Sequence, residues 1–527
     1  MCYMAHILKT HYKTSLILLG LTLVSLSCGT ENKGGAPEES SIAPTTEQTD
    51  TFEEAEQGLT TNSLLAGSQE FTCAVLEGDV WCWGSNEYRQ LGENVPWSKE
   101  HSYESGSASP VRVAGLEGGV TALGVGLSHA CAIQNGGVKC WGSNSFPYRD
   151  TFEGGGGSFD DYLLRLDKLG NPEALSGSGK LSSVPVAAVG LESGVEALTA
   201  GLDHTCALRG GEVFCWGANN IGQSGQPLEM ATPDPYAPAW GGSFHNNRPY
   251  ENTSSDISIK QGRIVPIPTK VAGLEPGVRG ISARNNTTCA LTKNNEVMCW
   301  GDNSFFEMGR QQGMDYFTFD TCREYCAGSV HHYSARPIVV PEFSGAFNML
   351  GSGCVASFET IQCVGWNNVD RIEQEYATNK THPTWNDGSG VDYRLLERET
   401  FSELSPVVVR VVNPNGGISS LQSQVVAYRW SEAGTEICAI VNKAVHCWAS
   451  KHEAVSGGGE DYYVEARILP GLERDVVSLG TNCALKDTEN AKPELWCWGY
   501  NDKGQVGNGE RTDEYIQTPV KVVPSSR

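Results

Sequence analysis

The chain has 527 residues and a formal net charge of −24 at pH 7, and glycine occurs 61 times. A surface this negative repels phosphate backbones, because nucleic-acid binding needs clustered Lys and Arg, so the charge argues against a nucleic-acid-binding protein. The glycine content favours strands joined by tight turns over a helical bundle.

Residues 1–27 are expected to be a signal peptide. Lys9 and Lys13 precede a mostly apolar stretch of 12 residues. That stretch is too short to span a bilayer comfortably and has the length of a signal-peptide core. It runs into Ser-Leu-Ser-Cys-Gly at 25–29, which resembles a bacterial lipobox although its leucine stands one place late. The resemblance implies lipid attachment at Cys28; ordinary signal cleavage and a retained anchor are the alternatives.

Residues 28–62 are expected to form an acidic, lipid-anchored flexible linker. From residue 29 onward this segment holds eight acids and one basic residue, Lys33, together with Pro, Thr, Ser and Gly. It shows no apolar periodicity, as is typical of a self-repelling tether. The alternative is a disordered N-terminus without a particular role.

From residue 63 a hairpin pattern with two cysteines recurs. Between Cys131 and Cys140 the midpoint falls on Asn135 and Gly136, a favoured two-residue hairpin turn. Folding about such a turn places the cysteines opposite each other, within disulfide range, so one cross-strand disulfide is expected for each repeat. The seven pairs are Cys73 and Cys82, Cys131 and Cys140, Cys206 and Cys215, Cys289 and Cys299, Cys354 and Cys363, Cys438 and Cys447, and Cys483 and Cys497.

The other cysteines agree with an oxidising compartment outside the cytoplasm. Cys322 and Cys326 lie together in one insertion, where a further disulfide is expected. Cys2 leaves with the signal peptide and Cys28 carries the lipid, so all 18 cysteines are accounted for without an odd thiol.

The repeats resemble the regulator-of-chromosome-condensation repeat, in its bacterial, cysteine-paired form. Their shared motifs are Gly-x-x-His-Thr-x-Ala-Leu, Val-x-x-Trp-Gly-x-Asn and Gly-Gln-x-Gly. The last motif stands at 222–225 and 504–507, and at 90–92 without its first glycine. The resemblance covers residues 63–523 and is weak in the fifth and sixth repeats. It implies an all-β fold, a β-propeller of seven blades over residues 63–527.

We expect the propeller to be closed by its C-terminal strand. Most hairpins follow a strand such as 110–117, but the first hairpin lacks one, and a spare strand is present at 518–523. Pairing of that strand with the first blade would remove an open sheet edge.

Five long segments separate Cys-Trp-Gly strands from the next Pro-Val strands, at 93–109, 145–183, 226–265, 304–334 and 367–404. Equivalent loops emerge on one face of a propeller. They are rich in aromatic residues, which interface cores favour. We expect this face to bind a macromolecule; the alternative is that the loops pack on each other and cap the channel. The candidate binding residues are Trp97, Phe146, Tyr148, Phe159, Tyr162, Trp240, Phe244, Tyr250, Tyr316, Phe317, Trp385 and Tyr393.

The sequence predicts no catalytic residue, no cofactor and no metal site. Protease, hydrolase-elbow and phosphate-loop motifs are missing, and His129 and His204 stand at a repeat position that favours a structural role. Four zinc ligands could come from Cys322, Cys326 and the adjacent His331 and His332. In an oxidising compartment a disulfide between Cys322 and Cys326 is favoured. Adjacent histidines also cannot easily point at one metal.

The expected function is that of a non-enzymatic cell-envelope lipoprotein, in the outer membrane or secreted. As a monomer it would present its propeller as a protein- or glycan-binding scaffold. One alternative is an inhibitor of a secreted or periplasmic enzyme, as some bacterial relatives inhibit β-lactamases. Another is a propeller hydrolase or lyase with a loop-built active site, which fold alone does not exclude. The expected compartment disfavours nucleotide exchange on a small GTPase, the activity of the family's nuclear founder.

Overall fold

The computed structural model describes the chain from residue 63 onward, with gaps. Among these residues every regular element is a β-strand. None of the described segments forms a helix long and apolar enough to cross a membrane. The described residues are 63–97, 104–147, 163–165, 168–172, 181–228, 232–233, 244–245, 248–249, 263–303, 308, 314–318, 330–343, 345–351, 353–358, 360–363, 409–412, 418–425, 435–455, 459–487 and 492–524.

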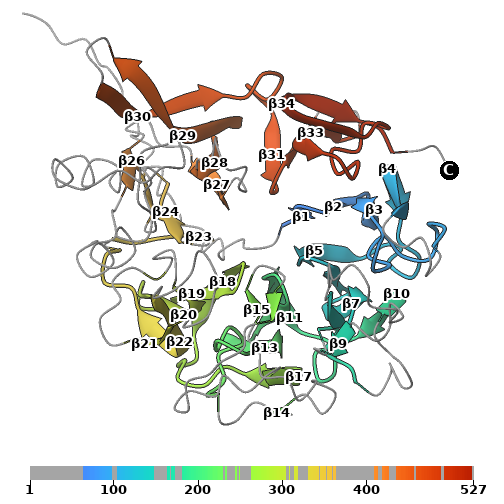
Figure 1. The fold of residues 1–527 in the computed structure, drawn as a ribbon, viewed down its shortest axis with the longest axis vertical. Helices are drawn as coiled ribbons and strands as arrows, with labels where there is room; N and C mark the ends of the chain where they lie inside the picture. Colours follow the sequence, from blue (N-terminus) through green and yellow to red (C-terminus); the bar gives the residue numbers. More distant parts are fainter. Residues whose placement is uncertain are drawn as a thin grey trace, which may run out of the picture. The chain divides into compact units, whose positions relative to one another are not determined.

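The strands form antiparallel sheets of four or five strands that follow one another along the chain, in a β-propeller arrangement (Figure 1). The first sheet, β1-β2-β3-β4, consists of Leu65–Gly67, Phe71–Leu76, Asp79–Ser85 and Gly106–Arg112. The next, β5-β6-β7-β10, consists of Val120–Val125, His129–Gln134, Gly137–Ser143 and Leu181–Ala187. In the third, β11-β12-β13-β17-β14, the strands are Val195–Ala200, His204–Arg209, Glu212–Ala218, Arg263–Lys270 and Thr232–Pro233.

The remaining sheets repeat this plan. In β18-β19-β20-β22-β21 the strands are Val278–Arg284, Thr287–Thr292, Val297–Asp302, Val330–Val339 and Asp315–Thr318. Sheet β23-β24-β25-β26 consists of Met349–Gly351, Cys354–Ala356, Thr360–Cys363 and Val409–Val412, and sheet β27-β28-β29-β30 of Ile418–Val425, Thr435–Val441, Ala444–Val455 and Gly459–Ile468. The last sheet, β31-β32-β33-β34, consists of Val476–Leu479, Cys483–Lys486, Glu494–Asn501 and Thr512–Val522. Two small sheets are β8-β9 (Ser145–Pro147, Leu163–Arg165) and β15-β16 (Phe244–His245, Arg248–Pro249).

The central hairpin of the second sheet arises from local turn chemistry. Between β6 and β7, Asn135 has φ 52° and Gly136 has φ 81°. A two-residue turn with both φ angles positive matches the right-handed twist of the flanking strands. The turn sets the register, and Cys131 lies directly opposite Cys140. The expected hairpin is therefore present at this position.

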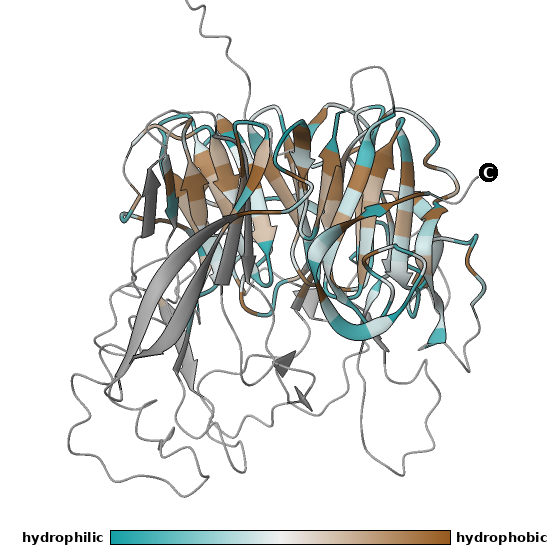
Figure 2. Ribbon diagram, turned by 90° about the horizontal axis from the view of Figure 1, so that it is seen from above, coloured by the Kyte–Doolittle hydropathy of each residue, from teal (hydrophilic) through white to brown (hydrophobic). Residues whose placement is uncertain are grey.

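Apolar side chains between successive sheets form the core. One cluster joins Val75 and Val80 of the first sheet to Leu123 and Trp141 of the second. Another joins the first sheet to the last, through Trp83 and residues such as Leu495. Figure 2 shows the hydrophobic residues along the strands and hydrophilic residues at many of the connections between them. Burial of these inner faces is the main contribution that holds the sheets against one another.

The pairing expected for the C-terminal strand was wrong. Strand β34 pairs with β33, the neighbouring strand of its own sheet. The first hairpin already has a fourth strand, because β4 folds back onto β3 and places Val111 opposite Cys82. The Pro-Val strand after each long connection thus completes the preceding hairpin, and not the following one as the sequence pattern suggests.

The outer strands carry prolines at bulges. Pro185 lies in the register shift between Ser182 and Val186, and Pro110 lies at the equivalent shift in β4. Proline has no N–H to donate, and a bulge twists an edge away from a partner. These devices protect the outer edges against pairing with another chain.

Candidate binding face

The long connections leave the sheets at one common end. Each joins the third strand of a sheet to the fourth, for example β3 to β4 across residues 86–105 and β7 to β10 across 144–180. Because neighbouring strands are antiparallel, the third strand ends where the fourth begins, and the turn between the first and second strands lies at that same end. The central hairpin turns lie at the opposite end. We call the end with the long connections the connection face.

Just beneath the connection face, a buried hydrogen bond joins neighbouring sheets. The tryptophan after the second cysteine of one sheet donates its indole N–H to a backbone carbonyl in a turn of the connection between the third and fourth strands of the preceding sheet. The indole nitrogens of Trp83, Trp141, Trp216 and Trp300 lie 2.8, 2.9, 2.9 and 3.1 Å from the carbonyl oxygens of Gln505, Gln90, Lys168 and Gln223.

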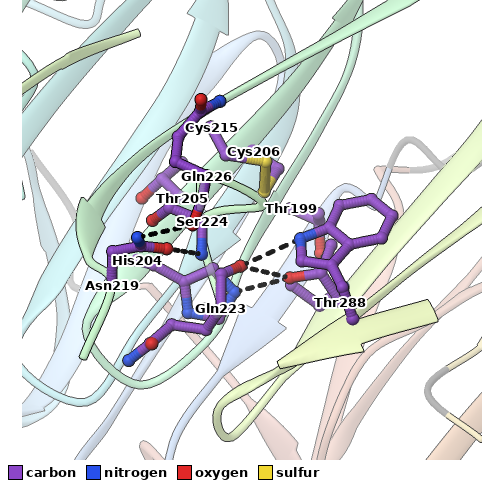
Figure 3. The surroundings of a disulfide bond; sticks show 12 residues. Thr199, His204, Thr205, Cys206, Cys215, Asn219, Gln223, Ser224, Gln226 and Thr288 are labelled. Carbon is purple, nitrogen blue, oxygen red and sulfur yellow. Dashed lines mark hydrogen bonds between the residues drawn. A yellow bond between two sulfur atoms is a disulfide. The ribbon is translucent and has the colours of Figure 1, made fainter. Parts of the chain in front are cut away.

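The asparagine of the Trp-Gly-x-Asn motif holds that turn in shape. Asn219 accepts a bond from the Ser224 amide at 3.1 Å and donates to the Gln226 carbonyl at 2.9 Å (Figure 3). Asn86 accepts from the Leu91 amide in the same way. The repeat motif therefore encodes both partners of each inter-sheet bond, the tryptophan and the turn that receives it.

Histidines extend this bonding between the sheets. His204 Nε2 lies 2.7 Å from Thr288 Oγ1, and Thr288 donates its hydroxyl proton to the Gln223 carbonyl (Figure 3). His204 must therefore donate from Nε2, which assigns its tautomer. His129 Nε2 contacts Thr205 Oγ1 at 2.9 Å. Both histidines are fully buried, so their place in the structure suits a packing role.

Burial sets the charge state of these histidines. It lowers the pKa of His204 to about 3. Burial also lowers the pKa of His129 well below its usual value, and the positive charge of Lys168 adds to this effect. Both rings are therefore neutral at pH 7.

We expect these histidines to make the fold acid-sensitive. In the unfolded chain both histidines bind protons below about pH 6.5. In the folded chain burial lowers the pKa of His204 to about 3 and lowers the pKa of His129 in the same direction. The contribution of His204 to the free energy of unfolding is therefore complete above about pH 6.5 and is lost as the pH falls towards 3, by up to about 1.4 kcal/mol per pH unit. The contribution of His129 is lost in the same direction as the pH falls. Urea unfolding at pH 7, 5 and 4 measures this slope. His204→Gln should be less stable at pH 7 but less acid-sensitive; an unchanged slope would contradict the assignment.

Sequence reasoning missed a buried ion pair. Lys168 Nζ lies 2.8 Å from Asp203 Oδ1 and 2.9 Å from Ser128 Oγ, and the side chains of Lys168 and Asp203 are 0% and 7% exposed. Burial lowers the pKa of Lys168, and the Asp203 carboxylate opposes this shift. Lys168 stands where other repeats have the turn glutamine. The sequence feature that could have identified Lys168 as a turn residue is Lys-Leu-Gly at 168–170, which aligns with Gln-Leu-Gly at 90–92.

Disulfides join the two strands of the central hairpins. Their Cα–Cα distances are 4.0–4.1 Å, as expected for directly opposed residues. Cys354 is also disulfide-bonded and lies opposite Cys363 in the register. Cys28, Cys322 and Cys326 lie outside the described residues. The other bonds join Cys73 to Cys82, Cys131 to Cys140, Cys206 to Cys215, Cys289 to Cys299, Cys438 to Cys447 and Cys483 to Cys497.

Of the aromatic residues expected on the connection face, only Trp97 has a described side chain. Phe146, Phe244, Tyr316 and Phe317 lie in strands β8, β15 and β21, and their side chains are outside the description. Within the part of the chain that is described, no group of three His, Cys, Asp or Glu residues could hold a metal ion. The expected residues that lie wholly outside the description are Tyr148, Phe159, Tyr162, Trp240, Tyr250, Trp385 and Tyr393.

Trp97 is held in place at the connection face of the first sheet. Its indole N–H donates to the Glu87 carbonyl at 2.9 Å. The Arg89 guanidinium carbon lies 4.3 Å from the centroid of the Trp97 ring, within the range of a cation–π contact. Trp97 and Arg89 are both half-buried, so each reaches solvent.

Two segments match family models of the Regulator of chromosome condensation (RCC1) repeat, at residues 77–133 and 278–307. Prp20p from Saccharomyces cerevisiae, a solved structure, is 16% identical with a TM-score of 0.42, over 88% of this chain and 76% of that one. Human WBSCR16 is 14% identical with a TM-score of 0.45, over 85% of this chain and 95% of that one. The chain therefore contains repeats of the regulator of chromosome condensation (RCC1) type, whose motif residues form the bonds between its sheets.

Proposed function

We propose that this protein is a lipid-anchored scaffold outside the cytoplasm that binds a protein or glycan at its connection face. One observation carries the proposal: disulfide-bonded sheets, bonded to one another, direct their long connections to a common end. A rigid support with variable loops is a recurrent arrangement for binding sites. The binding role needs no catalytic residue and no cofactor.

The scaffold is proposed to be a closed propeller of seven blades. The Trp83 indole bonds to the Gln505 carbonyl of the last sheet, as Trp141 bonds to Gln90 between the first two sheets. Thr72 donates to the same Gln505 carbonyl at 3.0 Å. Equivalent contacts between first and last blades support a ring closed by side chains rather than by an exchanged strand.

The compartment is proposed from the disulfides, which are rare in cytosolic proteins. In this proposal residues 1–27 are removed as a signal peptide, Cys28 carries the lipid, and residues 28–62 hold the propeller away from the outer membrane. The proline-bearing outer strands support a monomer. Intact mass of membrane-extracted protein tests this part, with a lipidated chain beginning at Cys28 expected and an unprocessed chain contradicting it.

Site-specific photo-crosslinking in cells tests the binding face. A photoreactive amino acid at exposed Glu104, just before β4 at the connection face, samples that face, and the same amino acid at exposed Glu117, near the hairpin turns, is the matched control. A discrete crosslinked species from position 104 and none from position 117 is the expected result. Equal crosslinking from both positions, or none from either, would contradict a binding role for the connection face.

A further inference from the structure

One turn of the connection face has an unusual backbone. Arg89 has φ 63°, whereas the equivalent residues of two other turns are Gly222, φ 79°, and Gly504, φ 83°. Glycine adopts this left-handed conformation readily, and a residue with a side chain does so at a cost in free energy. Such outliers persist where the surrounding structure holds them, often at ligand sites. The question is therefore what the Arg89 side chain does.

Two contacts orient the side chain of Arg89, one with the Trp97 ring of its own sheet and one with Ser183 of the neighbouring sheet. Its guanidinium lies over the Trp97 ring, with 4.3 Å from the guanidinium carbon to the ring centroid. Trp97 is itself fixed by its bond to the Glu87 carbonyl. On the neighbouring sheet, Ser183 Oγ lies 3.4 Å from Arg89 Nη1, at the long limit for a hydrogen bond. The guanidinium is thus held at the boundary between the first two sheets with little of its hydrogen-bonding capacity used.

Stacking leaves the edge of the guanidinium available. An arginine carries five N–H donors in the plane of its head group, and a ring contact occupies only the face of that plane. Among the described residues no carboxylate forms an ion pair with Arg89, although acids outnumber Lys and Arg by 24 in this chain. A planar fork of this kind matches the two oxygens of a carboxylate.

We propose that Arg89, stacked on Trp97, binds a side-chain carboxylate of an acidic segment of the partner. This inference rests on the proposed function and specifies the chemistry of its partner. Arg and Trp are the residue types most enriched among dominant interface residues, and here both are already immobilised. Glu87 lies in the same turn and the chain is strongly negative, so a singly charged carboxylate is favoured over a doubly charged phosphate.

The equivalent turns, which have glycine in place of Arg89, suggest a variant that removes the Arg89 side chain without straining the backbone. Arg89→Gly restores the residue found at positions 222 and 504, so it should leave the melting temperature unchanged or raise it. Arg89→Lys keeps the charge but loses the planar fork. Arg209→Ala is the matched control, because Arg209 also stacks on an aromatic ring, that of Phe214 at 4.8 Å, at the end of the sheet with the hairpin turns.

The probe is a random heptapeptide library with amidated C-termini, selected on the full-length protein. We expect enrichment of Asp and Glu. The selected peptide should bind at least about tenfold more weakly when its acid is replaced by the matching amide, and equally weakly to Arg89→Gly. Combining the amide-substituted peptide with Arg89→Gly should weaken binding little more than either change alone, because both changes remove the same contact. Arg209→Ala should bind like the wild type.

Other results would overturn the proposal. A library without acidic enrichment, or Arg89→Gly binding as tightly as the wild type, would exclude a carboxylate anchored at Arg89. A phosphoserine or free C-terminal carboxylate that binds more than tenfold better than the side-chain acid would assign the site to that group instead. If photo-crosslinking at position 104 succeeds while the peptide result fails, the anchor is wrong and the binding scaffold stands. If both fail, the proposed function fails as well.

Discussion

Asp203→Ala should lower the free energy of unfolding by about 3–5 kcal/mol, the usual cost of leaving a buried charge without its partner. Lys168 has no exposed side-chain surface, and without Asp203 its ammonium group would keep only the Ser128 hydroxyl as a described partner. The loss should also loosen the contact between the second and third sheets, because the two residues lie on either side of it. Urea unfolding, followed by tryptophan fluorescence and near-ultraviolet circular dichroism, measures the change.

Two matched variants make this prediction specific. Gln90 and Ser128 occupy the positions of Lys168 and Asp203 at the preceding contact between sheets, so Lys168→Gln with Asp203→Ser should recover most of the lost stability. Breaking the exposed pair of Lys270 and Glu212 with Lys270→Gln should cost less than about 1 kcal/mol. An effect of Asp203→Ala no larger than that of Lys270→Gln would show that the buried pair does not stabilise the fold.

The hairpins could be predicted from the sequence because their signals are local. Asn135 and Gly136 fix a two-residue turn, and that turn fixes which cysteines face each other. The role of each tryptophan was less specific in the sequence. Its burial could be expected, but its bond to a carbonyl of the preceding sheet joins residues that are 51 positions apart for Trp141 and Gln90.

The position of the fourth strand could not be predicted because a repeat has no intrinsic starting point. The same Pro-Val strand lies between two hairpins in the sequence, and only its pairing shows which hairpin it completes. In the structure β4 pairs with β3, and β34 pairs with β33. The C-terminal strand β34 is therefore the ordinary fourth strand of the last sheet.

The sequence predicted which face of the propeller carries the candidate site, but not which side chains would make its polar contacts. Trp97 was expected there because aromatic residues mark interfaces, but the stacking of Arg89 depends on a backbone conformation that a missing glycine only hints at. The ion pair of Lys168 was hidden for a similar reason. Its turn lies within the long connection between β7 and β10, far from the Cys-Trp-Gly motif that would identify it, and no spacing rule brings Asp203 beside it.

Reduction of the disulfides should produce the largest loss of stability in this protein. A cross-link that closes a loop of about ten residues contributes roughly 2.5 kcal/mol through the unfolded state, less any strain. Cys206→Ala with Cys215→Ala should therefore lower the free energy of unfolding by about 2–3 kcal/mol, and reduction of all the hairpins should remove several times as much. Typical folding free energies are about 5–15 kcal/mol, so the fully reduced chain should not refold.

Because the cysteines are buried, loss of stability through disulfide reduction can be distinguished from nonspecific effects of the reductant on the native protein. Cys206 and Cys215 are 0% exposed, so a reductant should leave the native protein intact and act only once urea opens the sheets. Intact mass then gains two hydrogens for each bond broken, and alkylation without reductant is the control. Free thiols in protein taken directly from cells would contradict the oxidising compartment. An unchanged urea midpoint after complete reduction would instead show that packing and inter-sheet bonds such as that of Trp141 hold the propeller together by themselves.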